Sequence, residues 1–280
     1  MNFFAPDDMD RFAALYPNVP GKLSHRLLDH ELLALEALVG LAGRLDPGNV
    51  EYNAGDLPIG VDPQDVPHTG LSPQETIRRI EECGSWMVLK NVNEDPAYGA
   101  LLEQILAELA AAVEPVSGKM LTKLGFIFIS SPGAVTPFHM DPEHNVLLQI
   151  RGSKKMTIFP GDETIVPAEK HEAYHVGGHR NLDWRDEFMG HGEIFDLQPG
   201  DAVHVPVKRP HWVKNGDAPS ISFSITWRSQ WSYEEADARG LNHLLRSAGL
   251  EPASPAQFPE RNVGKSLAFR AIRRARALGK

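Results

Sequence analysis

The sequence is poor in cysteine and in long apolar runs. It has one cysteine, Cys83, in 280 residues, which excludes an intrachain disulfide and a zinc site built from cysteines. A single cysteine also fits a reducing compartment. No apolar run approaches the roughly 20 residues of a membrane span, and the first ten residues, MNFFAPDDMD, lack the basic-then-apolar pattern of a signal peptide. We therefore expect a cytoplasmic protein with no membrane partner.

Positive charge is also scarce, because the formal net charge at pH 7 is −9. Such a balance opposes binding to polyanions, so we do not expect nucleic acid as a partner. The exception is the segment 265–280, which has no acidic residue and carries Lys265, Arg270, Arg273, Arg274, Arg276 and Lys280. A basic helix of this kind is expected to pack on its own domain or on a second subunit. It is the one segment that would favour nucleic acid, an acidic protein or a membrane surface.

The pattern of apolar residues changes near residue 119. Before it, helical spacing predicts helices over 24–45, 72–82 and 98–113, with a loop over 47–72 and a buried strand at 86–89. After it, short runs rich in Val, Ile, Phe and Thr are typical of antiparallel strands that close into a barrel or sandwich. These runs are 125–131, 145–151, 154–159, 194–197, 202–206, 211–214 and 219–228, and helices over 233–248 and 266–278 follow.

This order of elements predicts an α+β fold. We expect effectively one domain, in which an N-terminal helical and mixed α/β region (1–118) packs on a β core (119–230) and C-terminal helices (231–280) complete the chain.

Two blocks of the β region carry candidate metal ligands. Residues 136–145 read TPFHMDPEHN and contain His139 and Asp141, whose spacing puts both side chains on one face of an extended chain. A lone His-x-Asp pair is a weak signal, and a third ligand must come from elsewhere. Residues 200–212 read GDAVHVPVKRPHW and offer His211, with His204 as its rival. Two imidazoles and one carboxylate with open positions suit a non-haem Fe(II) oxygenase.

These blocks resemble the JmjC (jumonji-type) branch of the Fe(II)/2-oxoglutarate-dependent oxygenases. They are particularly similar to the JmjC-only hydroxylases related to the asparaginyl hydroxylase of hypoxia-inducible factor. The family pattern T-P-x-H-x-D, then N, then Q-I-x-G-x-K, then F-P is matched over residues 136–160, and G-D-x-x-x-x-P-x-x-x-x-H is matched over 200–211. The resemblance covers about residues 119–230, with weaker similarity around 86–92. It implies a cupin-like double-stranded β-helix (jelly-roll) core.

The resemblance also implies roles for the matched residues. His139, Asp141 and His211 would ligate Fe(II). Lys154 would pair with the distal carboxylate of the co-substrate 2-oxoglutarate, and Thr136 would donate its hydroxyl to the same carboxylate. Chemistry independently supports Lys154, because a buried dicarboxylate needs a compact cation.

Two further positions are matched less closely. Asn145 corresponds to a family asparagine near the co-substrate, and Ser224 stands where relatives carry an asparagine on the last core strand. Lys155, next to Lys154, should point the opposite way because side chains alternate along a strand.

Residues 161–193 form a long insert between the two ligand blocks. His171, His175 and His179 have helical spacing, but Gly177-Gly178 interrupts it, so we expect a loop over the mouth of the barrel rather than a second metal site. Loops on a rigid scaffold often carry specificity. We therefore expect this insert to form a substrate lip in which His175 and Trp184 act on the substrate, and to become more ordered on binding.

The expected activity is that of a dioxygenase that uses Fe(II), 2-oxoglutarate and O2 to hydroxylate a protein side chain or a small molecule. Demethylation is less expected, because the chain lacks a cysteine-rich zinc module. Two alternatives stay open. One is a cupin-fold metalloenzyme without 2-oxoglutarate, against which the pair Asp141 and Lys154 argues, and the other is a non-catalytic JmjC-like regulatory or binding protein. The resemblance further implies a homodimer joined through the C-terminal helices.

Overall fold

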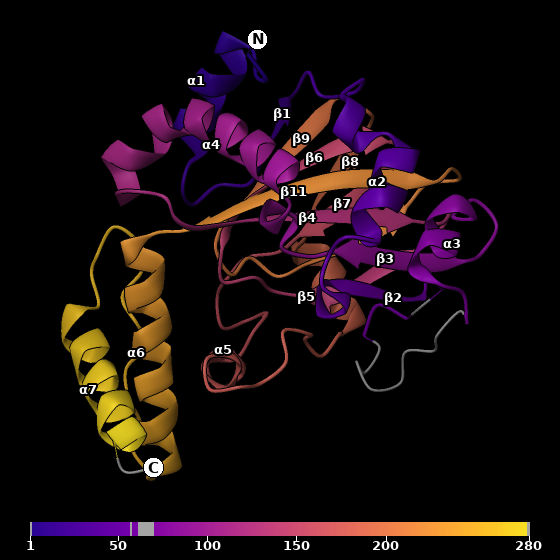
Figure 1. The fold of residues 1–280 in the computed structure, drawn as a ribbon. Helices are drawn as coiled ribbons and strands as arrows, with labels where there is room; N and C mark the ends of the chain where they lie inside the picture. The colour runs from indigo at the N-terminus through magenta and orange to yellow at the C-terminus, as the bar shows by residue number, and fades with distance from the viewer. Residues whose placement is uncertain (1, 57, 61–69, 279–280) are drawn as a thin grey trace.

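Two antiparallel sheets form the centre of the molecule, and helices cover the outer face of the larger sheet (Figure 1). The computed structural model describes residues 2–56, 58–60 and 70–278. The seven-stranded sheet has the order β1-β9-β6-β11-β4-β3-β2, and the four-stranded sheet has the order β5-β10-β7-β8. This arrangement confirms the predicted α+β class.

The strands are short and dominate the second half of the chain. They are β1 (Gly21–Ser24), β2 (Val50–Ala54), β3 (Ser85–Leu89), β4 (Leu121–Ser130), β5 (Val135–His139), β6 (His144–Arg151), β7 (Lys154–Ile158), β8 (Glu193–Leu197), β9 (Asp201–Val205), β10 (His211–Asn215) and β11 (Ser220–Arg228). The helices are α1 (Pro6–Leu15), α2 (Leu35–Ala42), α3 (Pro73–Arg78), α4 (Pro96–Ser117), α5 (Ala168–Tyr174), α6 (Gln230–Ser247) and α7 (Val263–Leu278).

The centre of the larger sheet is buried on both faces. In β6 every residue except Arg151 is buried, and in β11 every residue except Arg228 is buried. One face packs against the helices in a cluster that includes Phe223 and Leu106, and the other faces the smaller sheet across a second cluster that includes Leu147 and Met156. β6 contains the apolar run Val146-Leu147-Leu148, and β11 alternates Ser or Thr with Ile, Phe and Trp, so the local pattern predicts both strands.

A tight hairpin between β6 and β7 places the candidate lysine. Gly152 turns the chain at a φ of +66°, and a Cβ at this position would collide with the Pro219 carbonyl, so the turn needs glycine. Lys154, the first residue of β7, is therefore buried, whereas Lys155 is exposed. The predicted opposite orientation of these two lysines is confirmed.

The first half of the chain departs from the prediction. The helix expected over 24–45 is instead β1, a 3-10 turn η1 (Glu31–Leu33) and α2. The backbone at the start of this segment makes long-range hydrogen bonds instead of helical ones. β1 pairs with β9, and the backbone N–H of His25 donates to the Gly200 carbonyl. Tertiary pairing here overrides helical leucine spacing.

Other elements were not expected from local pattern. The loop predicted over 47–72 contains the edge strand β2, while its residues 57 and 61–69 lie outside the described residues, as does Lys280 of the basic segment. The helices α1 and α5 and the strand β5 were also missed. The division of the chain at residues 118 and 230 stays a prediction.

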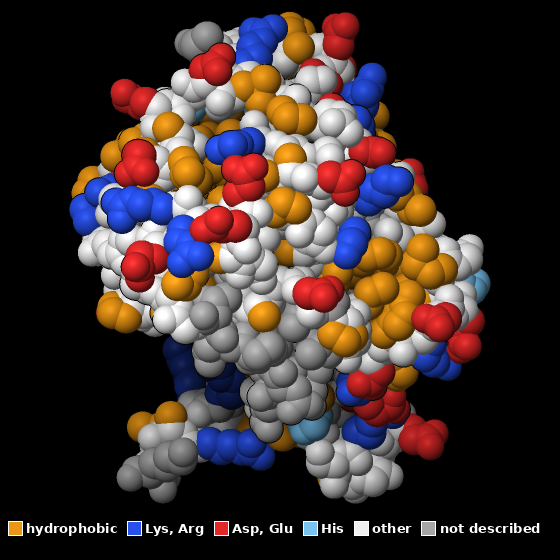
Figure 2. All heavy atoms as spheres, turned by 90° about the vertical axis from the view of Figure 1, so that its right-hand side faces the viewer, with side chains coloured by type: hydrophobic (Ala, Val, Ile, Leu, Met, Phe, Trp, Pro, Cys, Tyr) orange, Lys and Arg blue, Asp and Glu red, His pale blue; other side chains and the backbone are white. Residues whose placement is uncertain are grey.

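The surface has no dominant sign of charge on the face that Figure 2 shows. There, among the described side chains, blue basic and red acidic groups are interspersed. None of the helices in the described residues is long and apolar enough to cross a bilayer.

The last two helices form a hairpin beside the barrel (Figure 1). α6 is tied to the barrel by a buried ionic cluster, in which Lys208 and Arg239 both bind Glu235. The side chains of Lys208 and Glu235 are each 6% exposed. On α7, Leu267 is 62% exposed, and the homodimer implied by the resemblance stays a prediction.

Replacing Glu235 with alanine is expected to destabilise the protein by about 3–5 kcal/mol, because it leaves Lys208 buried without its counter-charge. Thermal or urea unfolding monitored by circular dichroism would measure the loss. Glu36→Ala is the matched control, since Glu36 pairs with Arg78 on the surface and is 74% exposed. That variant should change stability by about 1 kcal/mol or less. Equal losses in the two variants would contradict the prediction.

Candidate active site

Strand pairing brings the two candidate histidine ligands together. His139 ends β5, His211 begins β10, and the two residues are direct partners in the antiparallel register. Their rings lie 4.2 Å apart between centroids, as expected for opposed residues on one face of a sheet.

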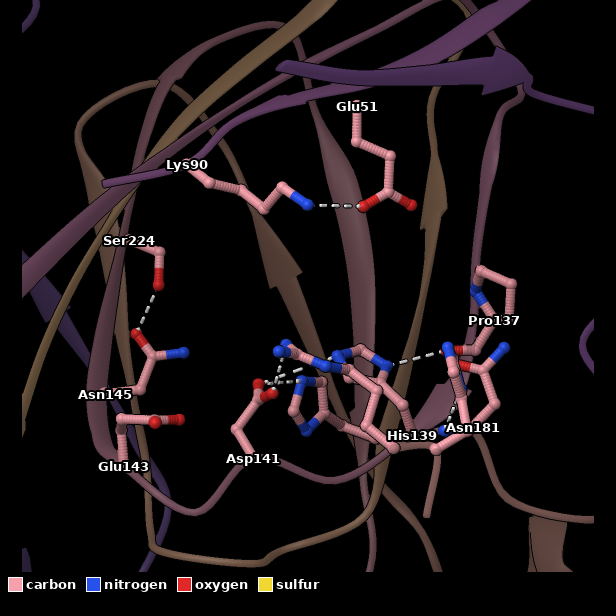
Figure 3. A network of polar contacts seen from close by, with 12 residues as sticks. Glu51, Lys90, Pro137, His139, Asp141, Glu143, Asn145, Asn181 and Ser224 are labelled. Atoms are coloured by element: carbon pink, nitrogen blue, oxygen red, sulfur yellow. Dashed lines mark hydrogen bonds and ion pairs between the residues drawn. The ribbon is translucent and has the colours of Figure 1, made fainter. Parts of the chain in front are cut away.

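Asp141 follows β5 and completes the group. Its Oδ2 lies 3.6 Å from Nε2 of His139 and 3.7 Å from Nε2 of His211 (Figure 3). In the described part of the chain, these three residues form the one group of His, Cys, Asp or Glu side chains close enough to share a metal ion. The rival ligand His204 lies elsewhere, on β9, where its ring packs against Phe12 and its Nδ1 pairs with the Val19 carbonyl.

Backbone carbonyls orient both imidazoles for metal binding. Nδ1–H of His139 donates to the Pro137 carbonyl at 2.7 Å, and Nδ1–H of His211 donates to the Arg209 carbonyl at 2.9 Å. In this tautomer the Nε2 lone pairs face Asp141. Burial, followed by the influence of His139, lowers the pKa of His211 to about 4, so the His211 imidazole is neutral at pH 7.

The Asp141 carboxylate is ionised and held from two sides. Burial would raise its pKa, but His139, Arg180 and His211 outweigh burial and keep the pKa far below its usual value. Oδ1 of Asp141 accepts a hydrogen bond from Nη1 of Arg180 at 2.9 Å, and its backbone carbonyl accepts one from the N–H of Lys208 at 2.8 Å. Two imidazole nitrogens and one carboxylate oxygen are a donor set that fits a divalent transition metal such as iron.

Lys154 lines the same cavity, and its side chain is buried. Its residue is 5% exposed, and no carboxylate of the described residues pairs with its ammonium. Burial lowers the pKa of Lys154 to about 7. A buried cation without a partner costs free energy, and this cost is recovered where a ligand brings an anion. The lysine therefore fits a carboxylate-bearing co-substrate.

Two neighbours orient the remaining candidate side chains as donors. Nε1–H of Trp86 donates to Oγ1 of Thr136 at 2.9 Å, which leaves the Thr136 hydroxyl proton free for another acceptor. The Ser224 hydroxyl donates to Oδ1 of Asn145 at 2.7 Å, so the amide NH2 of Asn145 faces the cavity (Figure 3). Ser224 thus orients the Asn145 amide toward the cavity.

One cavity of about 350 Å³ unites the site. It is lined by all seven residues expected there, namely Thr136, His139, Asp141, Asn145, Lys154, His211 and Ser224. Trp86 and Phe128 contribute apolar walls. Across the cavity from the histidines, Lys90 and Glu51 form an ion pair of 3.1 Å (Figure 3).

The insert 161–193 is a structured element with its own apolar cluster. Its Leu182 and Phe188 pack with Phe138 of β5, and the Trp184 ring lies 5.3 Å from the Phe138 ring in an edge-to-face contact. Within the insert, residues 179–181 line the cavity.

The two residues expected to act on the substrate, His175 and Trp184, do not line this cavity, and their effect on substrate turnover stays a prediction. Trp184 is used for packing, and His175 lies in the charged surroundings of Lys208 and Glu235 rather than at the cavity. His171, His175 and His179 do not converge on one point, so the described residues offer no second metal site there.

The sequence missed Trp86 and Arg180 as parts of the site. Trp86 was recognised only as part of a buried strand, and Arg180 lies 39 residues from Asp141. Neither residue carries a local signal of its role, because each role depends on a contact between distant segments.

Comparisons with known proteins agree with this geometry. No family model matches the chain. Over 110 residues, or 36% of this chain, it is 30% identical to "Jumonji C domain-containing protein 5" of Drosophila melanogaster, and it covers 26% of that protein. A structure of E. coli YcfD superposes with a TM-score of 0.55 at 17% identity, over 94% of this chain and 66% of YcfD.

A second YcfD structure is described as a ribosomal oxygenase of Escherichia coli in complex with cobalt and 2-oxoglutarate. It superposes with a TM-score of 0.50 at 14% identity, over 94% of this chain and 64% of that chain. The chain thus spans about a quarter of the fly protein and about two thirds of YcfD. At these identities the structural likeness shows the fold, and it confirms the double-stranded β-helix expected from the sequence.

Proposed function

We propose that this chain is a JmjC-domain protein and that it acts as an Fe(II)- and 2-oxoglutarate-dependent oxygenase. The observation that carries the proposal is Lys154, whose buried ammonium pairs with no carboxylate of the described residues and lies in the cavity that also holds His139, Asp141 and His211. A metal site alone needs no such cation, whereas the distal carboxylate of 2-oxoglutarate would pair with it and restore its normal charge.

Each side chain of the site then has a task. His139, Asp141 and His211 would hold the iron, and Lys154 with Thr136 would bind the distal carboxylate of 2-oxoglutarate. Asn145, oriented by Ser224, would donate its amide to a co-substrate oxygen. The metal with its co-substrates supplies the oxidative chemistry, which converts 2-oxoglutarate and O2 into succinate and carbon dioxide and adds one oxygen atom to a substrate C–H bond.

We propose hydroxylation of a protein side chain as the reaction, with a small molecule as the second candidate. YcfD is described as a ribosomal oxygenase, which makes ribosomal proteins the first substrates to assay. The apolar walls formed by Trp86 and Phe128, together with the polar residues 179–181, offer a chain both an apolar surface and hydrogen-bonding groups.

The decisive assay measures succinate formed from 2-oxoglutarate by Fe(II)-loaded protein, with and without ribosomal proteins. Succinate formation that depends on the protein supports the proposal, and a mass increase of one oxygen on a ribosomal protein identifies the substrate. A cupin-fold metalloenzyme of another type would bind metal without binding 2-oxoglutarate. A non-catalytic relative would release no succinate under either condition, and either result would refute the proposal.

Replacing Trp86 with phenylalanine is expected to raise the KM for 2-oxoglutarate while leaving kcat near wild type. The variant removes the indole N–H that orients the Thr136 hydroxyl, and loss of about 1 kcal/mol corresponds to roughly a fivefold change in affinity. Steady-state succinate assays would measure both constants. Trp184→Phe is the matched control, because the Trp184 indole N–H donates a hydrogen bond to Asp186 outside the cavity. Similar KM values for the two variants would contradict the prediction.

A further inference from the structure

The two oxygens of the Asp141 carboxylate have different surroundings. Oδ2 faces the Nε2 atoms of both His139 and His211, whereas Oδ1 accepts a hydrogen bond from Nη1 of Arg180 at 2.9 Å. A carboxylate can bind a metal through one oxygen or through both. In this structure one of the two oxygens already has a cationic partner.

Arg180 reaches Asp141 from a segment that is fixed to β5 by its backbone. The N–H of Met140 donates to the Arg180 carbonyl at 3.3 Å, and the N–H of Leu182 donates to the Phe138 carbonyl at 2.9 Å. Leu182 is also buried in the apolar cluster that the insert shares with β5. The arginine therefore projects from a segment whose backbone is anchored at Arg180 itself and at Leu182.

We propose that Arg180 is a positioning residue that restricts Asp141 to a single metal-binding oxygen, an inference that rests on the proposed function. A six-coordinate ion held by His139, His211 and one oxygen of Asp141 would keep three positions for other ligands. Chelation by 2-oxoglutarate would use two of these positions and O2 would use the third. If Asp141 bound through both oxygens, it would compete with the co-substrate for one of them.

The contribution of this ion pair to folding is expected to be small. The Arg180 side chain is 47% exposed, and ion pairs of such exposure add about 1 kcal/mol or less to stability. Variants of Arg180 should therefore fold, and any change in the site can be assigned to the carboxylate rather than to loss of structure.

Two binding affinities, for Co(II) and for 2-oxoglutarate, distinguish a positioning role of Arg180 from a general structural role. Removing a cation close to a divalent ion relieves repulsion, so Arg180→Ala should leave Co(II) affinity unchanged or make it tighter. The same variant should weaken the binding of 2-oxoglutarate to the Co(II)-loaded protein by about tenfold or more. The two affinities would thus move independently or in opposite directions.

The experiment measures Co(II) affinity, 2-oxoglutarate affinity of the Co(II)-loaded protein and its visible absorption, which reports the coordination number. Arg180→Lys keeps the charge and should recover part of the 2-oxoglutarate affinity lost in Arg180→Ala. Arg185→Ala is the matched control, because Arg185 lies in the same insert, pairs with Glu187 and is 56% exposed. All three measurements should match wild type in that control.

Two results would overturn the inference while leaving the proposed function intact. One is parallel weakening of metal and co-substrate binding in Arg180→Ala, which would show a general loss of the site. The other is wild-type affinity for both ligands in that variant. If wild-type protein binds Co(II) but no 2-oxoglutarate, the proposed function fails and the inference fails with it.

Discussion

Replacing Lys154 with alanine is expected to lower the affinity for 2-oxoglutarate by roughly 100-fold or more, because a buried carboxylate left without its counter-charge costs several kcal/mol. Lys154 is 5% exposed and has no partner among the described residues, so its ammonium is available to a bound carboxylate. Calorimetric titration of the metal-loaded protein would measure the affinity, and the KM of the uncoupled reaction would follow it.

Lys155→Ala is the matched control, since Lys155 is the next residue of β7 and points to solvent. It should bind 2-oxoglutarate as wild type does. Comparable losses in the two variants would show that the orientation of β7 does not decide co-substrate binding, and the role of Lys154 would have to be abandoned.

The same lysine predicts how 2-oxoglutarate binding depends on pH. Burial lowers its pKa to about 7 in the free protein, and the bound dianion favours the protonated form. Above pH 7 binding must therefore take up a proton, and the affinity should fall by about tenfold per pH unit. Below pH 7 Lys154 is already protonated and this dependence should disappear. Titrations between pH 6 and 9 would measure the slope, and Lys154→Ala should lack it.

The sequence predicted the second half of the fold better than the first for a physical reason. β6 carries a short apolar run and β11 alternates polar with apolar residues, and turns bound both strands, so their pattern is visible locally. The segment 24–45 has leucines at helical spacing, yet its backbone near His25 is used by β1 and by the Gly200 carbonyl. Which of these competing patterns is adopted depends on a strand about 175 residues away.

The candidate site divides in the same way. His139, Asp141, Lys154 and His211 stand in blocks whose spacing follows from strand ends and a hairpin, and the structure brings them to one cavity. Arg180 belongs to an insert that has no pattern pointing to this residue. Its role depends on an ion pair with Asp141. Contacts of this kind come from packing between distant segments, which no local spacing encodes.

Replacing Asp141 with alanine is expected to abolish measurable turnover while the fold survives. Asp141 supplies one of the three donor atoms and the one negative charge of the group, so its loss should lower metal affinity by more than about 100-fold. The variant also leaves the Arg180 cation facing the two imidazoles without its carboxylate, and a divalent ion would then meet uncompensated repulsion. Co(II) titration would measure the affinity, and circular dichroism would confirm that the protein is folded.

Two further variants separate the causes of that loss. Asp141→Asn keeps the shape of the side chain and one neutral oxygen but removes the negative charge, so it should bind metal almost as poorly as Asp141→Ala if charge dominates. His204→Gln tests the rival ligand, whose ring packs against Phe12 on the far side of β9, and it should bind Co(II) as wild type does. The assignment of His139, Asp141 and His211 would be wrong if His204→Gln lost the metal or if Asp141→Ala retained it. In either case the 3.6 and 3.7 Å separations around Oδ2 would describe a charged contact in the barrel rather than a metal centre.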